Sequence, residues 1–198
     1  MKQNNKDRIK QAALGLFGKK GYEDTSLHEI ACSVGIKKPS IYYHFESKEA
    51  IFTAVLEDLL ITEKTAYQQI RERMESGFPK ENLRKLFDLY CQRLETTEEA
   101  LLWKRVTFFP PLQFKGLIEE KFFQFEHSIT SILFEIFEDG RELNIFRDVD
   151  KNEFAASFLC LVDGLFLEHH YYRKGLFEQR KNSVWKVYTL GIYRGKGE

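Results

Sequence analysis

A chain of 198 residues is long enough for one large or two small domains. Its composition, 43% hydrophobic and 30% charged, is ordinary for a globular protein, and no run approaches the roughly 18 apolar residues of a membrane-spanning helix. The net charge is zero, but residues 1–50 carry nine Lys and Arg against six Asp and Glu, a net +3 that leaves −3 for the remainder. A basic end on a neutral chain favours a module that faces a polyanion.

Cellular location is predicted from the start of the chain and from its cysteines. The first residues are polar and no apolar segment follows them, so no signal peptide is expected. The three cysteines are odd in number, far apart and set among apolar residues, which favours buried reduced thiols over a disulfide or metal set: Cys32, Cys91 and Cys160. We therefore expect a cytoplasmic protein without a membrane segment.

The first two helices are predicted from apolar spacing and capping residues. Residues 7–20 have helical periodicity, with cations in the last turn and Gly21 after it. Ser26 and Glu29 then form a Ser-x-x-Glu capping box, which predicts a helix that starts at Ser26. A hydroxyl at a helix N-terminus is also well placed to bind a phosphate, so Ser26 is a candidate DNA contact.

Residues 29–45 predict a helix, a tight turn at Gly35 and a short second helix that begins at Lys38 or Pro39. The apolar side chains supply a small buried face: Ile30, Ala31, Val34, Ile36, Ile41 and Phe45. The remaining side chains are expected to point outward: Lys37, Lys38, Ser40, Tyr42, Tyr43 and His44. This row offers cations and hydroxyls to phosphates and polar tips to base edges, as a helix-turn-helix needs when its second helix enters a major groove. Of the two tyrosines, Tyr42 is expected to be the more exposed.

The combined motif resembles the TetR family of bacterial transcriptional regulators. The residues that carry the resemblance are Ala12-Ala13, Leu16-Phe17, Gly21-Tyr22, Ile30-Ala31, Val34-Gly35-Ile36, Ile41-Tyr42-Tyr43-His44-Phe45 and Lys48-Glu49. The resemblance covers residues 8–52 tightly and is architectural beyond them. It implies that the following residues contact DNA: Lys38, Tyr42, Tyr43, His44 and Lys48. Lys37 stands where members of the family often have a serine or threonine that caps the second helix.

Amphipathic helices continue to the end of the chain. Ser47 is expected to cap a long helix that runs to about Met74. Further helices are expected over residues 81–94, 100–109, 115–138, 154–172 and a last segment that contains residues 184–192. Capping sequences at residues 96–99 and 150–153 open two of them, whereas Pro110-Pro111 and Asp139-Gly140 end two others. With no strand pattern in the sequence, the fold prediction is all-α with about nine helices.

Two domains are expected. Residues 1–47 would form a three-helix DNA-binding domain, and residues 48–198 a larger helical domain for effector binding and dimerisation. The resemblance implies that the last two helices pair with their copies in a second subunit, which makes a four-helix homodimer interface. It also implies that the long helix is the lever that changes the distance between the two DNA-binding heads.

The C-terminal half is rich in aromatic residues, most of which are expected to form its core. A cavity between helices, lined by some of them, would suit a hydrophobic small molecule, and the resemblance implies that an effector binds there. The candidate lining residues are Trp103, Phe108, Phe109, Phe122, Phe125, Phe166 and His169.

Glu168-His169-His170 is the other cluster that could carry chemistry. Adjacent histidines on a helix point about 100° apart and do not easily ligate one metal. We expect no metal, no cofactor and no enzymatic activity.

The sequence therefore predicts a homodimeric transcriptional regulator, a repressor that a small hydrophobic effector releases from a palindromic double-stranded DNA operator. Two other functions stay open. One is a DNA-binding regulator with a filled core that is controlled by a protein partner, and the other is a helical small-molecule-binding protein without DNA binding.

Overall fold

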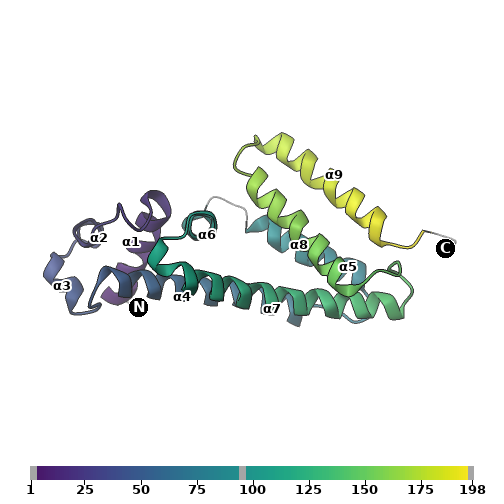
Figure 1. Ribbon diagram of the computed structural model, residues 1–198, viewed down its shortest axis with the longest axis horizontal. Coiled ribbons are helices and arrows are strands. Elements are labelled where there is room, and N and C mark those ends of the chain that lie inside the picture. The colour runs from purple at the N-terminus through teal and green to yellow at the C-terminus, as the bar shows by residue number, and fades with distance from the viewer. Residues whose placement is uncertain (1–3, 94–96, 196–198) are drawn as a thin grey trace. The chain divides into compact units, whose positions relative to one another are not determined.

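The computed structural model describes residues 4–93 and 97–195 (Figure 1). These residues contain no strand, only an isolated antiparallel bridge between Phe146 and Tyr193, so the all-α prediction is confirmed. The helices in the described part of the chain are α1 (Asn5–Lys20), α2 (Leu27–Val34), α3 (Lys38–Tyr42), α4 (Lys48–Glu72), α5 (Pro79–Gln92), α6 (Glu98–Phe108), the 3-10 helix η1 (Leu112–Phe114), α7 (Lys115–Glu142), α8 (Lys151–Glu168) and α9 (Lys174–Ile192).

Helix α7 passes through the residue that was predicted to end it. It continues to Glu142, two residues beyond Gly140. A Cβ added to Gly140 would lie 2.2 Å from a ring carbon of Phe146, a fully buried side chain. The glycine therefore permits Phe146 to pack on the helix, and this close approach explains its place in the sequence better than a helix stop does.

Two other predicted boundaries differ from the structure. The cap of α6 is Thr97, whose side chain accepts a hydrogen bond from the Ala100 amide at 3.1 Å, whereas Thr96 lies outside the described residues. Helix α8 ends at Glu168 and not near Tyr172, because the chain tightens there into a turn in which the Tyr171 amide donates to the Glu168 carbonyl at 2.9 Å. The predicted cap at Asp150 is confirmed, with 2.7 Å to the Asn152 amide.

The chain divides into two compact units. Unit 1 comprises residues Met1–Thr65 and Thr96–Phe125, and unit 2 comprises Ala66–Glu95 and Glu126–Glu198. Both α4 and α7 contribute to each unit, since the division falls within these two long helices. The separation of function at residue 48 stays a prediction.

An aromatic cluster forms the centre of unit 1. Phe52 of α4 lies with its ring centroid 5.1 Å from Phe17, 4.9 Å from Tyr22 and 4.5 Å from Phe114. Phe17 and Phe52 are fully buried. Apolar residues spaced along α1, α2, α3 and α4 thus meet in one core, which fixes the position of the short helix α3.

Helix α6 packs closely on α1 within unit 1. Gly18 of α1 lies in tight contact with α6, because an added Cβ would lie 3.3 Å from the Glu98 carbonyl oxygen and from the Leu102 amide nitrogen. Arg105 donates from Nε to the Gly18 carbonyl at 3.1 Å and from Nη2 to the Lys19 carbonyl at 3.0 Å. These contacts satisfy carbonyls at the C-terminal end of α1 that have no partner within the helix.

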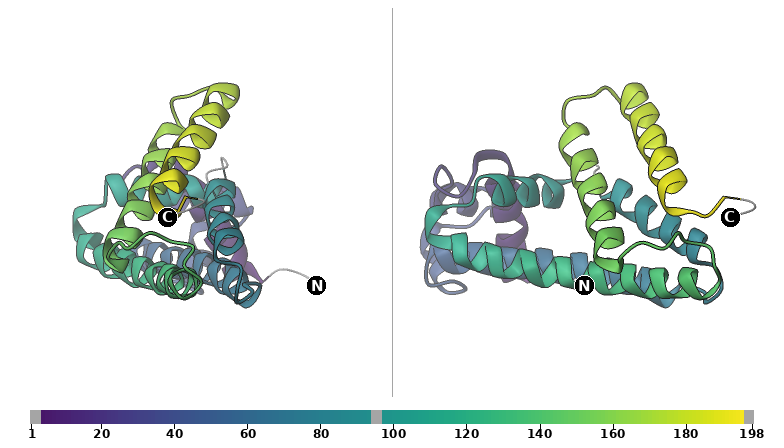
Figure 2. Two further views of the ribbon diagram at one scale, coloured as in Figure 1. Left: turned by 90° about the vertical axis from the view of Figure 1, so that its right-hand side faces the viewer. Right: turned by 45° about the vertical axis from the view of Figure 1, so that its right-hand side comes forward.

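Unit 2 is organised around Phe146, whose ring lies 5.1 Å from that of Phe154 and 5.7 Å from that of Tyr193. Helices α8 and α9 lie side by side and antiparallel in this unit (Figures 1 and 2).

The burial of the three cysteine thiols differs from the prediction. Cys32 and Cys160 are exposed and Cys91 is half-buried, although all three are free as expected. Periodicity placed these cysteines on helices, but both exposed ones lie away from the packed face.

Candidate nucleic-acid interface

The turn between α2 and α3 depends on Gly35. Its φ of 75° is left-handed, and its amide donates to the carbonyls of Ala31 and Cys32. Nothing lies within 4 Å of the position where a Cβ would stand, so the backbone angle and not crowding favours glycine here. The predicted helix–turn–helix over residues 29–45 is thus present in the structure.

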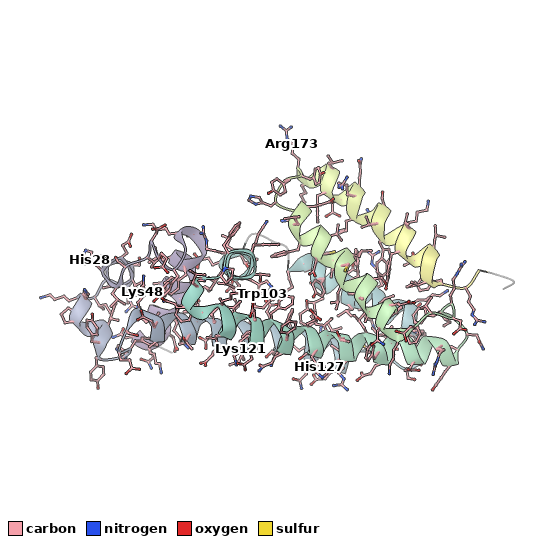
Figure 3. The ribbon with its side chains drawn as sticks, viewed as in Figure 1. His28, Lys48, Trp103, Lys121, His127 and Arg173 are labelled. Atoms are coloured by element: carbon pink, nitrogen blue, oxygen red, sulfur yellow. The ribbon has the colours of Figure 1, made fainter. Side chains whose placement is uncertain are left out.

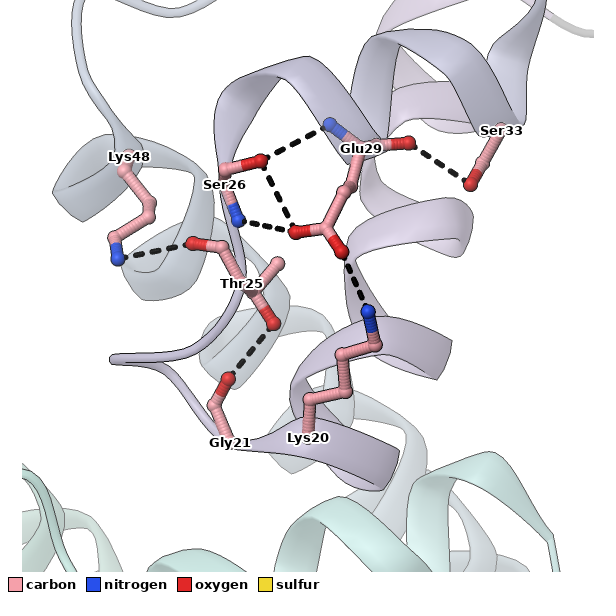
Figure 4. A network of polar contacts seen from close by, with 7 residues as sticks. All are labelled: Lys20, Gly21, Thr25, Ser26, Glu29, Ser33 and Lys48. Carbon is pink, nitrogen blue, oxygen red and sulfur yellow. Dashed lines mark hydrogen bonds and ion pairs between the residues drawn. The ribbon is translucent and has the colours of Figure 1, made fainter.

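The capping box at the start of α2 is confirmed (Figure 4). The Ser26 hydroxyl accepts from the Glu29 amide at 3.2 Å, and the Glu29 carboxylate accepts from the Ser26 amide at 2.9 Å. Lys20 also binds this carboxylate, and Lys20 together with the Ser26 amide and hydroxyl lowers the pKa of Glu29 to about 2. Because the hydroxyl also donates to Glu29 at 3.0 Å, a phosphate would have to take the place of that bond.

Helix α3 presents the predicted row of side chains above a buried anchor. Ile41 is fully buried and Phe45 nearly so, while the chain turns after α3 through a hydrogen bond from the Phe45 amide to the Ile41 carbonyl at 2.9 Å. The exposed members of the row are Lys37, Lys38, Ser40, Tyr42 and Tyr43, and His44 is half-buried. Lys37 stands at the N-cap without a side-chain hydrogen bond to the helix, as expected for a lysine there.

The expectation that Tyr42 is the more exposed tyrosine is wrong. Tyr43 is 89% exposed and Tyr42 is 52% exposed. At about 100° per residue, Tyr43 lies about 200° around the helix from buried Ile41 and so points away from the core, whereas Tyr42 lies to one side. The Tyr43 ring contacts His44 edge-on, at 5.2 Å between centroids.

Lys48 also belongs to unit 1, but its ammonium is directed at backbone carbonyls of the protein. Figure 3 labels Lys48, which donates to the Thr25 carbonyl at 3.0 Å (Figure 4). It also donates to the Tyr22 carbonyl at 2.8 Å and lies 4.2 Å from the centroid of the Tyr22 ring. The Tyr22 hydroxyl in turn donates to Glu49 at 2.8 Å. A contact between Lys48 and DNA stays a prediction.

Two further residues position the interface and were not singled out from the sequence. Arg8 of α1 donates from Nη2 to the Val34 carbonyl at 2.7 Å, at the end of α2. Thr25, which is buried, donates to the Gly21 carbonyl at 2.7 Å. A basic residue and a threonine beside helix ends are common, so only the three-dimensional contacts reveal these roles.

The candidate effector residues are distributed over both units. Trp103 and Phe125 lie in unit 1 with ring centroids 5.5 Å apart. Phe125 is buried, Phe108 and Phe109 are exposed, and Phe122 is half-buried. Phe166 and His169 belong to unit 2, where His169 contacts the Phe177 ring at 4.9 Å. Their assignment to an effector cavity stays a prediction.

The Glu168-His169-His170 cluster has a structural role for its carboxylate, which pairs with Arg180. Residues 4–93 and 97–195 contain no group of three or more His, Cys, Asp or Glu side chains that could hold a metal ion. In the same ranges no helix is long and apolar enough to cross a membrane.

The fold and this surface define an all-α protein with an N-terminal helix-turn-helix. Residues 9–55 match the family of bacterial regulatory proteins described as the tetR family. The match to the TetR family thus covers this N-terminal helix-turn-helix segment, about a quarter of the chain.

Curated relatives match over segments of similar length. The negative transcriptional regulator IcaR of the biofilm operon icaADBC from Staphylococcus aureus (strain Newman) is 55% identical over 47 residues, which are 24% of this chain and 25% of the relative. The protein of the same name from Staphylococcus epidermidis is 47% identical over 53 residues, 27% of this chain and 29% of the relative. The matches therefore span between a quarter and a third of these relatives.

Solved structures resemble the whole chain. A TetR transcription regulator from Haloarcula marismortui has a TM-score of 0.77 at 19% identity, over 96% of this chain and 98% of that one. A transcriptional regulator from Saccharomonospora viridis, in complex with choline, has a TM-score of 0.75 at 22% identity, over 96% and 98%. At these identities the likeness establishes the fold.

Proposed function

We propose that the protein is a homodimeric, DNA-binding transcriptional repressor that a small hydrophobic effector releases from a palindromic operator. The observation that carries this proposal is the row on α3, in which Lys37, Lys38, Ser40, Tyr42 and Tyr43 are exposed over buried Ile41. A short helix with an apolar anchor and an outward row of cations, hydroxyls and rings can enter a major groove. The family match of residues 9–55 supports the same reading.

Roles within the row follow from side-chain chemistry. Lys37 and Lys38 place positive charges at the edge of a DNA groove, where they can pair with phosphates. Tyr42 and Tyr43 place a hydroxyl and an apolar ring next to base edges. Replacement of Lys38 should lower the affinity for all DNA sequences about equally, and replacement of Tyr43 should reduce the sequence specificity.

Dimerisation through α8 and α9 is supported by apolar side chains that unit 2 leaves uncovered. Val187 is 68% exposed and Leu190 is 65% exposed on α9, and Leu167 is exposed on the neighbouring α8. A second copy of the same two helices would cover them around a two-fold axis. A two-fold dimer would place two α3 helices about one DNA turn apart, which requires a palindromic site.

Effector control is the part of the proposal that rests most on the family match. The effector has to bind more tightly to the conformation that has low affinity for DNA. The coupling free energy between the two sites is typically about 1–3 kcal/mol. Because this coupling is reciprocal, bound DNA must lower the affinity of the protein for the effector by the same factor. A compound that binds tightly and leaves DNA affinity unchanged is not the inducer.

The proposal is tested by selecting bound sites from a pool of random double-stranded DNA. Three proteins are compared: the unaltered chain, Lys38→Ala on α3, and Lys64→Ala, which removes another exposed lysine from unit 1. We expect an enriched palindrome for the unaltered chain and for Lys64→Ala. On that palindrome, Lys38→Ala should lower the salt slope of the logarithm of affinity by about 0.9, the value for one lost phosphate contact.

A further inference from the structure

A cavity of about 570 Å³ lies in unit 1 between the end of α1 and the segment that joins α6 to α7. One wall consists of Lys20 to Asp24, and the other of Arg105, Val106 and residues 109–113. Figure 1 shows α6 beside α1 at this place. The volume is within the range of about 300–1,000 Å³ that small-molecule sites occupy.

The cavity has an apolar floor and an apolar rim. Its floor is made of side chains that belong to the core: Phe17, Phe52, Leu102 and Val106. At the rim, Phe109 is 78% exposed and Leu112 is 91% exposed, next to Pro110 and Pro111. Exposed rings and prolines beside a hollow offer a flat surface on which an aromatic or other apolar body can lie.

Arg105 brings a positive charge with an unused donor group to this wall. Its Nε and Nη2 donate to the carbonyls of Gly18 and Lys19, which holds the guanidinium in place. Its Nη1 lies 3.1 Å from the position of a Cβ built on Gly21, and among the described residues this atom has no hydrogen-bond partner. A fixed guanidinium with a free N–H suits a carboxylate, because charge-assisted hydrogen bonds are strong and the orientation is already set.

The other charges of the cavity orient such a ligand. The Lys20 ammonium is paired with Glu29. Glu23 and Asp24 are exposed in the α1–α2 loop and would repel an anion at that end. An anionic group is therefore favoured next to Arg105 and disfavoured at the acidic end of the opposite wall.

We propose that this cavity is a binding site for a small apolar carboxylate, with its anionic group at Nη1 of Arg105 and its body against Phe109 and Pro110. The site is separate from the proposed DNA-binding surface on α3, and of the candidate effector residues it includes only Phe109. One wall comes from the end of α1 and the loop that follows it, and the other from α6 and the segment after it, so an occupant would hold these two parts of unit 1 together.

The probe for this site is 4-benzoylbenzoate, an aromatic carboxylate whose excited ketone inserts into neighbouring C–H bonds. The full-length protein is irradiated with the probe, and the labelled peptides are located by mass spectrometry. We expect labels within residues 17–24 and 105–113. Affinity is measured separately by calorimetry.

Two matched pairs of variants test the roles of the ring and of the charge. Phe109→Ser should weaken binding about fivefold, because it removes the ring at the rim, whereas Phe123→Ser, which changes another exposed phenylalanine of unit 1 outside the cavity wall, should leave it unchanged. Glu23→Gln should tighten binding about twofold by removing a repelling charge, and Glu57→Gln, elsewhere in unit 1, should not.

The proposal is overturned by labels that lie only outside the two cavity segments, by equal losses in the two phenylalanine variants, or by no detectable binding at millimolar probe.

Discussion

The Lys48 ammonium lies 2.8 Å from the carbonyl oxygen of Tyr22 and 4.2 Å from the centroid of the same residue's ring. It also reaches the carbonyl of Thr25, at 3.0 Å. One cation at the start of α4 thus holds the loop that leads from α1 to α2. In this arrangement Lys48 positions the helix-turn-helix through the loop that precedes α2.

Replacing Lys48 with Met should therefore lower stability in the absence of DNA. The loss of hydrogen bonds from a charged group and of a cation–π contact should decrease the free energy of unfolding by about 1–2 kcal/mol, measured by urea denaturation. The control is Lys38→Ala, which changes an exposed lysine and should weaken DNA binding with little effect on stability. Equal stability of the two variants would show that the contacts of Lys48 contribute nothing to the fold.

The capping box makes stability depend on acid pH. The pKa of Glu29 is lowered to about 2 from 4.5 by Lys20 and by the Ser26 amide and hydroxyl. A carboxylate with a lowered pKa in the folded state contributes stability above its unfolded pKa and loses it as the pH falls toward the folded value. The difference in melting temperature between the unaltered protein and Glu29→Gln should be largest above pH 4.5 and shrink toward pH 2. A difference that is constant across this range would contradict the assignment.

Gly140 should tolerate no side chain. In Gly140→Ala the new Cβ would lie 2.2 Å from the Phe146 ring, which is buried against Phe154 and Tyr193 and has little room to move. We expect a loss of about 1–3 kcal/mol. Gly116→Ala, in the same helix but with nothing within 4 Å, should instead be neutral or stabilise the protein by up to about 1 kcal/mol. Chemical denaturation of both variants gives the comparison, and a similar loss in each would contradict it.

The reactivity of the cysteine thiols tests the proposed dimer interface. Cys32 and Cys160 are exposed in the single chain, and burial raises the pKa of half-buried Cys91 to about 12. Thiol reagents attack the thiolate, so Cys91 should react slowly. If α8 and α9 form the dimer interface, Cys160 on α8 should be protected while Cys32 reacts quickly with a disulfide reagent.

A variant pair separates this protection from simple burial. Val187→Asp places a charge among the exposed apolar residues of α9 and should produce monomers in which Cys160 reacts as quickly as Cys32. Ile61→Asp changes an exposed apolar residue of unit 1 and should leave both the dimer and the protection intact. Rapid reaction of Cys160 in a stable dimer would show that the interface lies elsewhere.

Local patterns predicted the helix-turn-helix in detail because its signals are short in range. The Ser26–Glu29 box, Gly35 and Pro39 act within a few residues, and all three have the expected positions. The apolar spacing of α7 likewise predicted its buried face, with Ile129, Ile132 and Ile136 all in the core.

The errors arose where a distant contact decides the outcome. Gly140 has the appearance of a helix stop, and only its contact with Phe146 shows why the helix continues. The hydrogen bond from Lys48 to the Tyr22 carbonyl, 26 residues away, likewise has no local signal, and the contact of Lys48 with DNA stays a prediction. The relative exposure of Tyr42 and Tyr43 depended on the angle of a five-residue helix, which spacing over so short a segment defines poorly.

Helix α3 is proposed to bind a palindromic DNA sequence, and selection from a pool of random double-stranded DNA is the first experiment to perform. The protein is used both as purified and after unfolding and refolding, which removes any bound effector. We expect an enriched palindrome whose half-sites lie about one helical turn apart, and the loss of that preference in Tyr43→Ala. A folded, dimeric protein that enriches no sequence after refolding would contradict it.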